Sequence, residues 1–207
     1  MRMISMLSTM LARIIFLKKQ KDFPRALLEI QTTARTLLGI DSVLISQCSP
    51  SQLMVLLGTD PSLAIPKAYI LGLLLKEEAD VRSLAGEEGE TLPLLVKSLE
   101  LLIDAWLQED RALAPEHTGH IEDLLKRLSG YALPGALLEK VMSYHEETGD
   151  FGRAENVLFD ILALRPEFAG EGLQFYRRLL MKSDEALRAG NLPREEVTEG
   201  IAELKNR

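Results

Sequence analysis

The 207-residue chain is long enough for one domain or one array of short repeats. Hydrophobic residues make up 46% and charged residues 27%, which is typical of a folded globular protein and argues against disorder. The formal net charge is −7, and an acidic chain is a poor general binder of nucleic acid, because phosphate contacts need clustered cations.

Leucine dominates the composition. The chain contains 40 leucines and only seven valines. Leucine favours helices, whereas β-branched residues such as valine favour strands. The composition therefore predicts an all-α protein.

Cysteine usage and hydropathy limit the compartment. The single cysteine, Cys48, can form neither an internal disulfide nor a cysteine-rich zinc site, so we expect a cytoplasmic protein. Residues 1–17 are apolar, but Arg13 interrupts them and no small-residue cleavage site follows before Lys18, which argues against a signal peptide. No run of apolar residues is long enough for a transmembrane helix.

The charge is unevenly distributed. Residues 1–36 carry seven basic and two acidic side chains, whereas the remaining 171 residues have a net charge of −12. The basic end could meet a membrane surface, an acidic partner or the acidic body of its own chain.

The first elements form a predicted N-terminal hairpin over residues 1–40. Residues 3–20 show an apolar residue every three or four positions, as one face of a helix requires. Pro24 suits the first turn of a second helix, and Gly39 suits its end.

Residues 41–66 are predicted to be a capped, irregular linker with one short helix over 53–57. A longer helix over 67–84 and an acidic turn over 86–89 follow. The next helix, 92–107, is apolar nearly all round, and we expect it to be the hub of the core.

Further amphipathic stretches extend to the end of the chain, with a short last helix from about Arg194. The sequence thus predicts a single all-helical domain over 1–207, in which residues 67–207 form an array of helical hairpins.

Three turns between these helices resemble one another. They read Lys-Asp-Phe-Pro-Arg-Ala over 21–26, Gly-Asp-Phe-Gly-Arg-Ala over 149–154 and Gly-Asn-Leu-Pro-Arg-Glu over 190–195. In each, a polar Asp or Asn can cap the following helix, and Phe or Leu can plug the open end of the hairpin. The similarity indicates a repeated hairpin whose period is not constant.

One hairpin resembles a tetratricopeptide repeat, which spaces bulky, small and aromatic positions and a proline over about 34 residues. The best match is 135–168, where the turn Gly149-Asp150-Phe151 is similar to the usual Gly-Asp-Tyr turn of that repeat. Met142, His145 and Leu158 depart from the pattern. The positions that define the repeat are Leu138, Val141, Met142, His145, Gly149, Ala154, Leu158 and Pro166.

The resemblance implies the fold class: all-α, a degenerate tetratricopeptide-like stack of antiparallel helical hairpins. The whole chain also resembles a bacterial family of uncharacterised tetratricopeptide-like proteins. That resemblance is carried by a Met-Ile-rich first helix, by Leu-Leu-Gly-Ile-Asp over 37–41, by Lys-Glu-Glu-Ala-Asp over 76–80 and by the late repeat. It implies a fold and no function.

In tetratricopeptide arrays the first helix of each hairpin lines a concave binding groove. The resemblance places Glu139, Ser143, Glu146 and Glu147 on that face. An acidic face predicts a protein or peptide partner that is basic or neutral.

No candidate for chemistry outweighs a structural interpretation. His117 and His120, flanked by Glu116 and Glu122, could share a metal, but they follow Pro115 at a helix start where a solvated cap is favoured. His145 is expected to pack in the core and Cys48 to be a spectator thiol. Glu100 and Asp104 could do acid–base work, yet a solvated stripe is favoured. We therefore expect no catalytic residue, no cofactor and no metal.

Three functional hypotheses follow. The leading one is a non-catalytic scaffold for protein–protein interaction, which includes self-association to a homo-oligomer. The alternative is association of the basic first helix with an anionic membrane surface, but packing of its apolar stripe on the second helix is favoured. An enzyme of unknown type is the least favoured.

Overall fold

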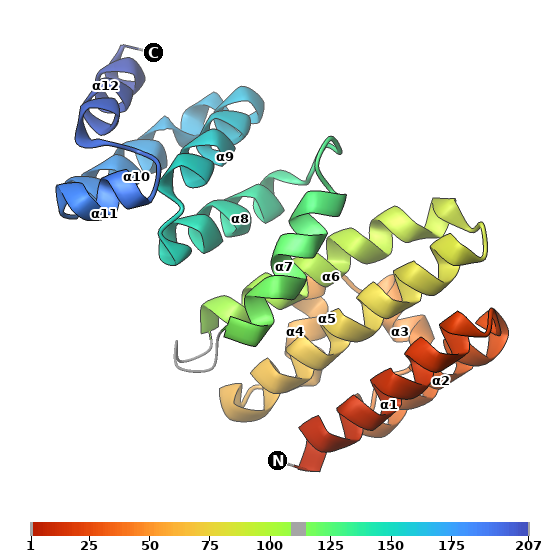
Figure 1. Cartoon of the computed structure of the whole chain (residues 1–207). Helices are drawn as coiled ribbons and strands as arrows, with labels where there is room; N and C mark the ends of the chain where they lie inside the picture. The colour runs from red at the N-terminus through yellow and green to blue at the C-terminus, as the bar shows by residue number, and fades with distance from the viewer. Residues whose placement is uncertain (1, 109–114, 207) are drawn as a thin grey trace. The chain divides into compact units, whose positions relative to one another are not determined.

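A computed structural model describes the backbone of residues 2–108 and 115–206, and the side chains of residues 6–108 and 118–206. These residues form helices joined by short turns and contain no strand, so the predicted all-α fold is confirmed (Figure 1). The chain divides into two compact units, residues 1–131 and residues 132–207. Each unit is described by itself.

The first unit contains helices α1 to α7. Their bounds are α1 (Arg2–Lys19), α2 (Phe23–Leu38), α3 (Ser42–Gln47), α4 (Pro50–Leu57), α5 (Pro61–Leu84), α6 (Glu88–Gln108) and α7 (Pro115–Arg127). The predicted α1–α2 hairpin is present, with Pro24 in the first turn of α2 and Gly39 ending it at a φ of 73°. The expected packing of the first helix is also present, because Leu7 and Ile14 are buried.

Residues 41–66 are more helical than predicted. Helix α3 was not expected; Asp41 caps it by accepting a hydrogen bond from the Leu44 amide at 3.0 Å. Helix α5 begins at Pro61 instead of residue 67, and α6 begins at Glu88 instead of residue 92. Both early starts place a proline inside the helix, at Pro66 and Pro93.

The two internal prolines are tolerated because of their surroundings. A proline within a helix leaves the carbonyl four residues earlier without its amide partner. Those carbonyls belong to Ser62 and Gly89, which are both exposed. Water can therefore satisfy them, and each helix continues through its proline.

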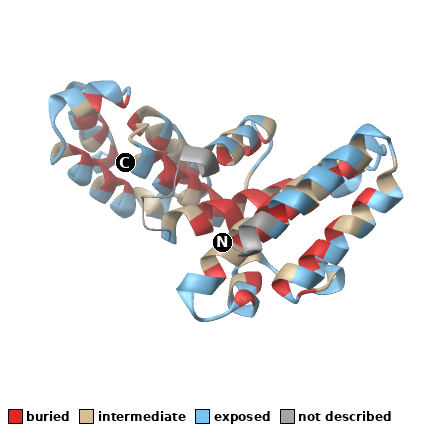
Figure 2. Ribbon diagram, turned by 60° about the horizontal axis from the view of Figure 1, so that its bottom comes forward, coloured by how far each residue is buried: buried red, intermediate tan, exposed pale blue. Residues whose placement is uncertain are grey.

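Helix α5 is the central element of the first unit. It packs against α1, α2, α4 and α6, and residues 70–75 on it are all buried (Figure 2). Helix α6, the expected hub, is also deeply buried, and it contacts α4, α5 and α7. The hub of this unit is therefore the α5–α6 pair, with α5 touching more of its neighbours.

A glycine allows α5 and α6 to approach closely. A Cβ atom on Gly72 would lie 2.7 Å from Cγ of Leu102, which is itself fully buried. At the same place the Ser98 hydroxyl donates a hydrogen bond of 2.7 Å to the Gly72 carbonyl. A buried hydroxyl is thus satisfied by a main-chain acceptor that only close packing brings within reach.

The second unit contains helices α8 to α12. Their bounds are α8 (Gly135–Thr148), α9 (Phe151–Leu164), the short 3-10 helix η2 (Pro166–Phe168), α10 (Ala169–Leu180), α11 (Asp184–Ala189) and α12 (Arg194–Lys205). Helices α8 and α9 pack together as a hairpin joined at Gly149, whose φ is 80° (Figure 1). Helix α10 packs against α12, where Gly200 leaves room for the buried ring of Tyr176.

Two of the similar turns found in the sequence meet in this unit. The Gly152 amide donates a hydrogen bond of 2.8 Å to the Gly190 carbonyl. A Cβ on Gly190 would lie 2.3 Å from the ring of Phe151, so the second turn has no space for a side chain there. The segment before this second turn forms two helices, α10 and α11.

The close approach at Gly72 generates a prediction. Alanine normally stabilises a helix interior by about 1 kcal/mol relative to glycine. Here overpacking against Leu102 costs about 1–3 kcal/mol, so we expect Gly72→Ala to lower the free energy of unfolding. Denaturation followed by the fluorescence of Trp106, the only tryptophan and a residue of α6, reports on the first unit.

The matched control is Gly119→Ala in α7, where an added Cβ meets no atom within 4 Å. This change should raise the stability slightly. Equal stabilisation by both substitutions would contradict the assigned role of Gly72.

Candidate functional site

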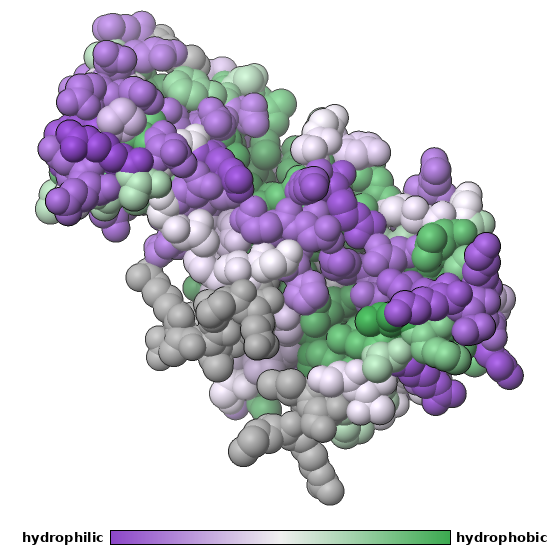
Figure 3. Space-filling model, in the orientation of Figure 1, coloured by the Kyte–Doolittle hydropathy of each residue, from purple (hydrophilic) through white to green (hydrophobic). Residues whose placement is uncertain are grey.

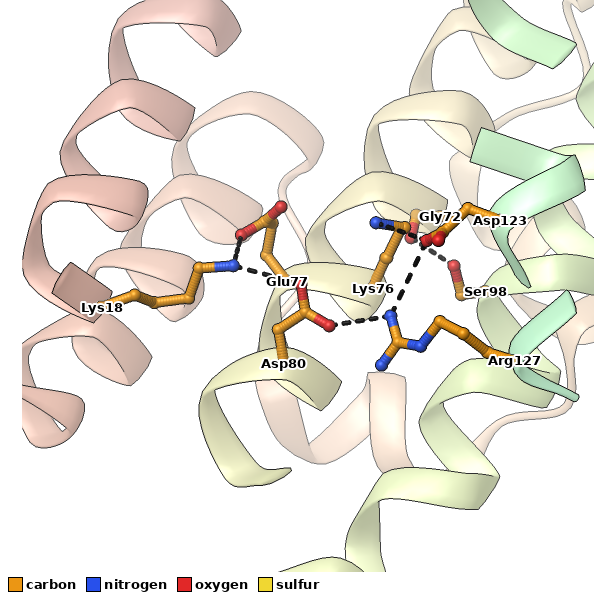
Figure 4. Close-up of polar contacts among 8 residues, drawn as sticks. All are labelled: Lys18, Gly72, Lys76, Glu77, Asp80, Ser98, Asp123 and Arg127. Carbon is orange, nitrogen blue, oxygen red and sulfur yellow. Dashed lines mark hydrogen bonds and ion pairs between the residues drawn. The ribbon is translucent and has the colours of Figure 1, made fainter. Parts of the chain in front are cut away.

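The most concentrated polar feature of the first unit is a charged seam along α5 (Figure 4). Its residues are Lys18 of α1, Lys76, Glu77 and Asp80 of α5, and Asp123 and Arg127 of α7. The Lys18 ammonium lies 2.5 Å from a Glu77 oxygen and 3.1 Å from Asp80. The other oxygen of Asp80 lies 2.8 Å from Arg127. Asp80 therefore links α1 and α7 through α5.

The seam is electrically balanced, with three cations facing three carboxylates. Asp123 completes it, 3.0 Å from the Lys76 ammonium. Burial disfavours the charge on Lys18, but Glu77 and Asp80 outweigh burial and raise the pKa of Lys18 above its usual value. A seam of this kind holds helices together and leaves little charge for a ligand.

The seam explains part of the charge asymmetry of the sequence. The basic N-terminal segment meets the acidic body of its own chain at Lys18, which was one of the three expected possibilities. Lys18 and Asp80 stand 62 positions apart in the chain, so sequence spacing could not reveal their contact. In the sequence, residues 76–80 were singled out only by the family resemblance, and no ion pair was predicted for them.

A second polar feature is a lysine that binds main-chain carbonyls. The Lys97 ammonium of α6 donates hydrogen bonds to the carbonyls of Ile45, Ser46 and Cys48 at 2.7, 3.3 and 2.8 Å. Burial lowers the pKa of Lys97, and Cys48 offsets only part of this effect. The contacts satisfy carbonyls at the end of α3, which helix ends otherwise leave without partners.

The predicted acidic face of α8 is largely engaged within its own unit. Glu139 lies 2.5 Å from Arg165, and Ser143 donates to the Glu139 carbonyl at 3.0 Å. Arg178 of α10 donates two hydrogen bonds to Glu146, at 2.6 and 2.7 Å. These bonds raise the pKa of Arg178 further above its usual value. The predicted groove face therefore carries fewer unpaired carboxylates than its sequence suggested.

Of the four predicted groove residues, Ser143 and Glu147 are the exposed ones, whereas Glu146 is half-buried. A basic or neutral partner on this face stays a prediction. The repeat-defining residues Leu138, Val141, Met142, His145, Ala154 and Leu158 are all buried, while Pro166 is exposed at the start of η2.

One carboxylate of the second unit is unusual. Glu155 of α9 accepts a hydrogen bond of 2.6 Å from the Tyr176 hydroxyl. Burial raises the pKa of Glu155, and nearby Glu196 and Glu203 of α12 add to this effect. The hydrogen bond ties α9 to α10, and among the described residues Glu155 belongs to no group of three His, Cys, Asp or Glu side chains that could hold a metal.

The remaining candidates for chemistry stay apart. The His117 side chain lies outside the described residues, and His120 is half-buried on α7. Cys48 is a half-buried thiol beside Lys97, and His145 is packed in the core. Within residues 6–108 and 118–206 no group of three His, Cys, Asp or Glu side chains is arranged to hold a metal. The described helices also include none with the length and hydropathy needed to cross a membrane.

A different surface combines exposure, apolar character and concavity. We call it the α4 surface, and its apolar members are Met54, Val55, Leu56 and Leu63. Val55 is 72% exposed, and Leu56 and Leu63 are exposed as well. Met54 and Val55 line an open hollow of about 450 Å³. Its lining comprises Ser51, Met54, Val55, Gly58, Thr59, Pro61, Ala64, Asp104 and Gln108.

The sequence did not single out the α4 surface. Residues 50–57 show apolar side chains on every side of a short helix, which usually indicates burial. Of the residues of α4, only Leu53 and Leu57 are buried, because the helix is too short to be covered on all sides.

The residues that the structure describes thus define an all-helical protein. The chain belongs to a family of unknown function, DUF6483, whose family model matches residues 1–207. No curated protein and no solved structure matches the chain.

The charged seam generates a prediction for Asp80→Asn. The substitution removes the carboxylate that Lys18 and Arg127 share, although each cation keeps a second acidic neighbour. We expect the free energy of unfolding of the first unit to fall by about 1–2 kcal/mol, measured by Trp106 fluorescence. Because the pKa of Lys18 is raised above 10.5, its pairing contributes fully below that pH and is lost as the pH rises through the folded-state pKa.

Arg25→Ala serves as the control for Asp80→Asn. Arg25 is 76% exposed and lies 3.6 Å from Asp22, so its loss should change the stability by less than about 0.5 kcal/mol. If the two variants were equally stable, the seam would have no special structural role.

Proposed function

We propose that the chain is a non-catalytic helical scaffold that binds a partner protein through the α4 surface. The observation that carries the proposal is the exposure of Val55, which is 72% exposed and lines an open hollow together with Met54. Exposed apolar side chains next to a concavity are typical of protein interfaces. The one cysteine of the chain supports a cytoplasmic location for this activity.

The chemistry of the α4 surface fits an uncharged, apolar segment of the partner. Asp104 is the one acidic residue among the described residues that line the hollow, and the neighbouring Asp60 is occupied as the cap of α5. Apolar area then supplies the affinity, and the hollow supplies a place for a protruding side chain. A second copy of the chain would satisfy the same requirements and is included in the proposal.

A tetratricopeptide-like character of the α8–α9 hairpin belongs to the same proposal. The left-handed Gly149 at the turn and the buried repeat positions on both helices support it. Helix pairs of this kind usually serve as rigid supports for binding surfaces.

The test is a charged substitution, Val55→Lys. Because Val55 is exposed and lies near the C-terminal end of α4, a cation is compatible with the fold. We expect the affinity for a protein partner that co-purifies with the natural chain to fall about 100-fold, because burying an unpaired charge is costly. Sedimentation velocity of both forms tests whether the partner is a second copy.

The matched control is Met181→Lys, at a methionine that is 87% exposed in the second unit. This variant should keep the partner of the natural chain. Retention of that partner by Val55→Lys, or its loss from both variants, would contradict the assignment of the interface to α4.

A further inference from the structure

The side of the α1–α2 hairpin that faces away from α5 combines cations with exposed apolar side chains. Both helices pack inward through buried residues, Leu7 and Ile14 on α1 and Ala26 and Ile30 on α2. On the opposite side Phe16 is 59% exposed and Leu28 is 62% exposed. Two large apolar side chains are thus exposed on the outer side of the hairpin, among the cations of the same helices.

The exposed residues follow helical spacing and form one stripe on each helix. Residues three or four apart lie on the same side of a helix. We call these two stripes the hairpin face. It comprises Arg13 and Phe16 on α1, Gln20 directly after α1, and Arg25, Leu28, Thr32 and Arg35 on α2, all exposed. Lys19 and Lys21 lie at the adjoining tip and are also exposed.

Acidic side chains are largely withdrawn from the hairpin face. Glu29 is half-buried and lies 3.2 Å from Arg13, and Asp22 caps α2 beside Arg25. The carboxylates of α5 beneath the hairpin, Glu77 and Asp80, are occupied by Lys18. The local charge is therefore positive, although the chain as a whole is acidic. Figure 3 shows apolar surface along α1 that gives way to strongly hydrophilic surface at its C-terminal end.

We propose that the hairpin face binds the anionic lipid surface of a membrane. Phe16 and Leu28 can enter the boundary between headgroups and acyl chains, while the long arginine and lysine side chains around them reach the anionic headgroups. Interleaving of this kind suits a lipid surface better than an acidic protein, which would offer no layer for isolated apolar side chains. The apolar stripe that packs on α2 and α5 is a different set of residues, so folding and lipid binding do not compete.

The test is co-sedimentation of the full chain with vesicles of neutral phosphatidylcholine, and with vesicles in which about one third of the lipid is phosphatidylserine. We expect binding to the anionic vesicles only, and weaker binding at high salt. A folded chain that fails to sediment with anionic vesicles, or binds neutral ones equally, overturns the proposal. If that chain instead binds an acidic protein through the same arginines, the face belongs to a protein interface.

Two variants separate the charge from the apolar contribution. Arg25→Gln with Arg35→Gln should lower the affinity for anionic vesicles about 25-fold, or about fivefold for each cation removed. Phe16→Ser with Leu28→Ser should weaken vesicle binding more at high salt than at low salt. At high salt the charges are screened, and the apolar contacts supply most of the remaining affinity. Both pairs are exposed, so unchanged thermal unfolding is expected.

The matched controls lie on the second unit. Arg177→Gln with Arg188→Gln changes the net charge equally at exposed positions and should alter binding less than about twofold. Met181→Ser removes an exposed apolar side chain elsewhere and should also have no effect. Equal losses in the hairpin variants and the controls would overturn the assignment to the hairpin face.

Discussion

The contact between α5 and α6 at Gly72 is the constraint on which the first unit depends. Without a Cβ at this position the two helices lie close enough for Ser98 to bond the Gly72 carbonyl and for Leu102 to fill the contact. That pair then offers two sides for the other helices. Helices α1 and α2 pack against α5, α7 packs against α6, and α4 contacts both α5 and α6. Electrostatic contacts such as the charged seam are added to a framework that packing has already set.

Sequence periodicity predicted helices well where proline or glycine residues marked their ends. Pro24 and Gly39 delimited α2, and Gly149 marked the α8–α9 turn, because each residue type has a backbone preference that acts locally. Periodicity failed at α3, whose six residues are too few to show a pattern, although Asp41 carried a capping signal. It also misplaced the starts of α5 and α6, because Pro66 and Pro93 were interpreted as helix starts. Each helix in fact begins earlier and continues through its proline, since the carbonyl that the proline leaves without a partner is exposed to water.

The surfaces were harder to predict than the helices. Four acidic and polar residues of α8 are predicted to line a groove, and two of these carboxylates form ion pairs with Arg165 and Arg178. Arg178 stands 32 positions from its partner, so the sequence gives no hint of the pairing. The α4 surface was missed because its apolar residues have the composition of a protein core. They are nevertheless exposed, since α4 is too short to be covered on all sides. Exposure is a property of the assembled unit and cannot be assigned from residue type.

The position of Asp80 has a consequence for how the sequence can change over time. One carboxylate serves cations from two helices, so the effect of replacing Lys18 depends on what stands at Asp80 and Arg127. Substitutions at such coupled positions are not additive. With a neutral residue at Asp80, Lys18 would pair with Glu77 alone and Arg127 with Asp123 alone, so a later change at either cation would have a different effect than it has beside Asp80. Divergent relatives should therefore keep or exchange these three residues as a set.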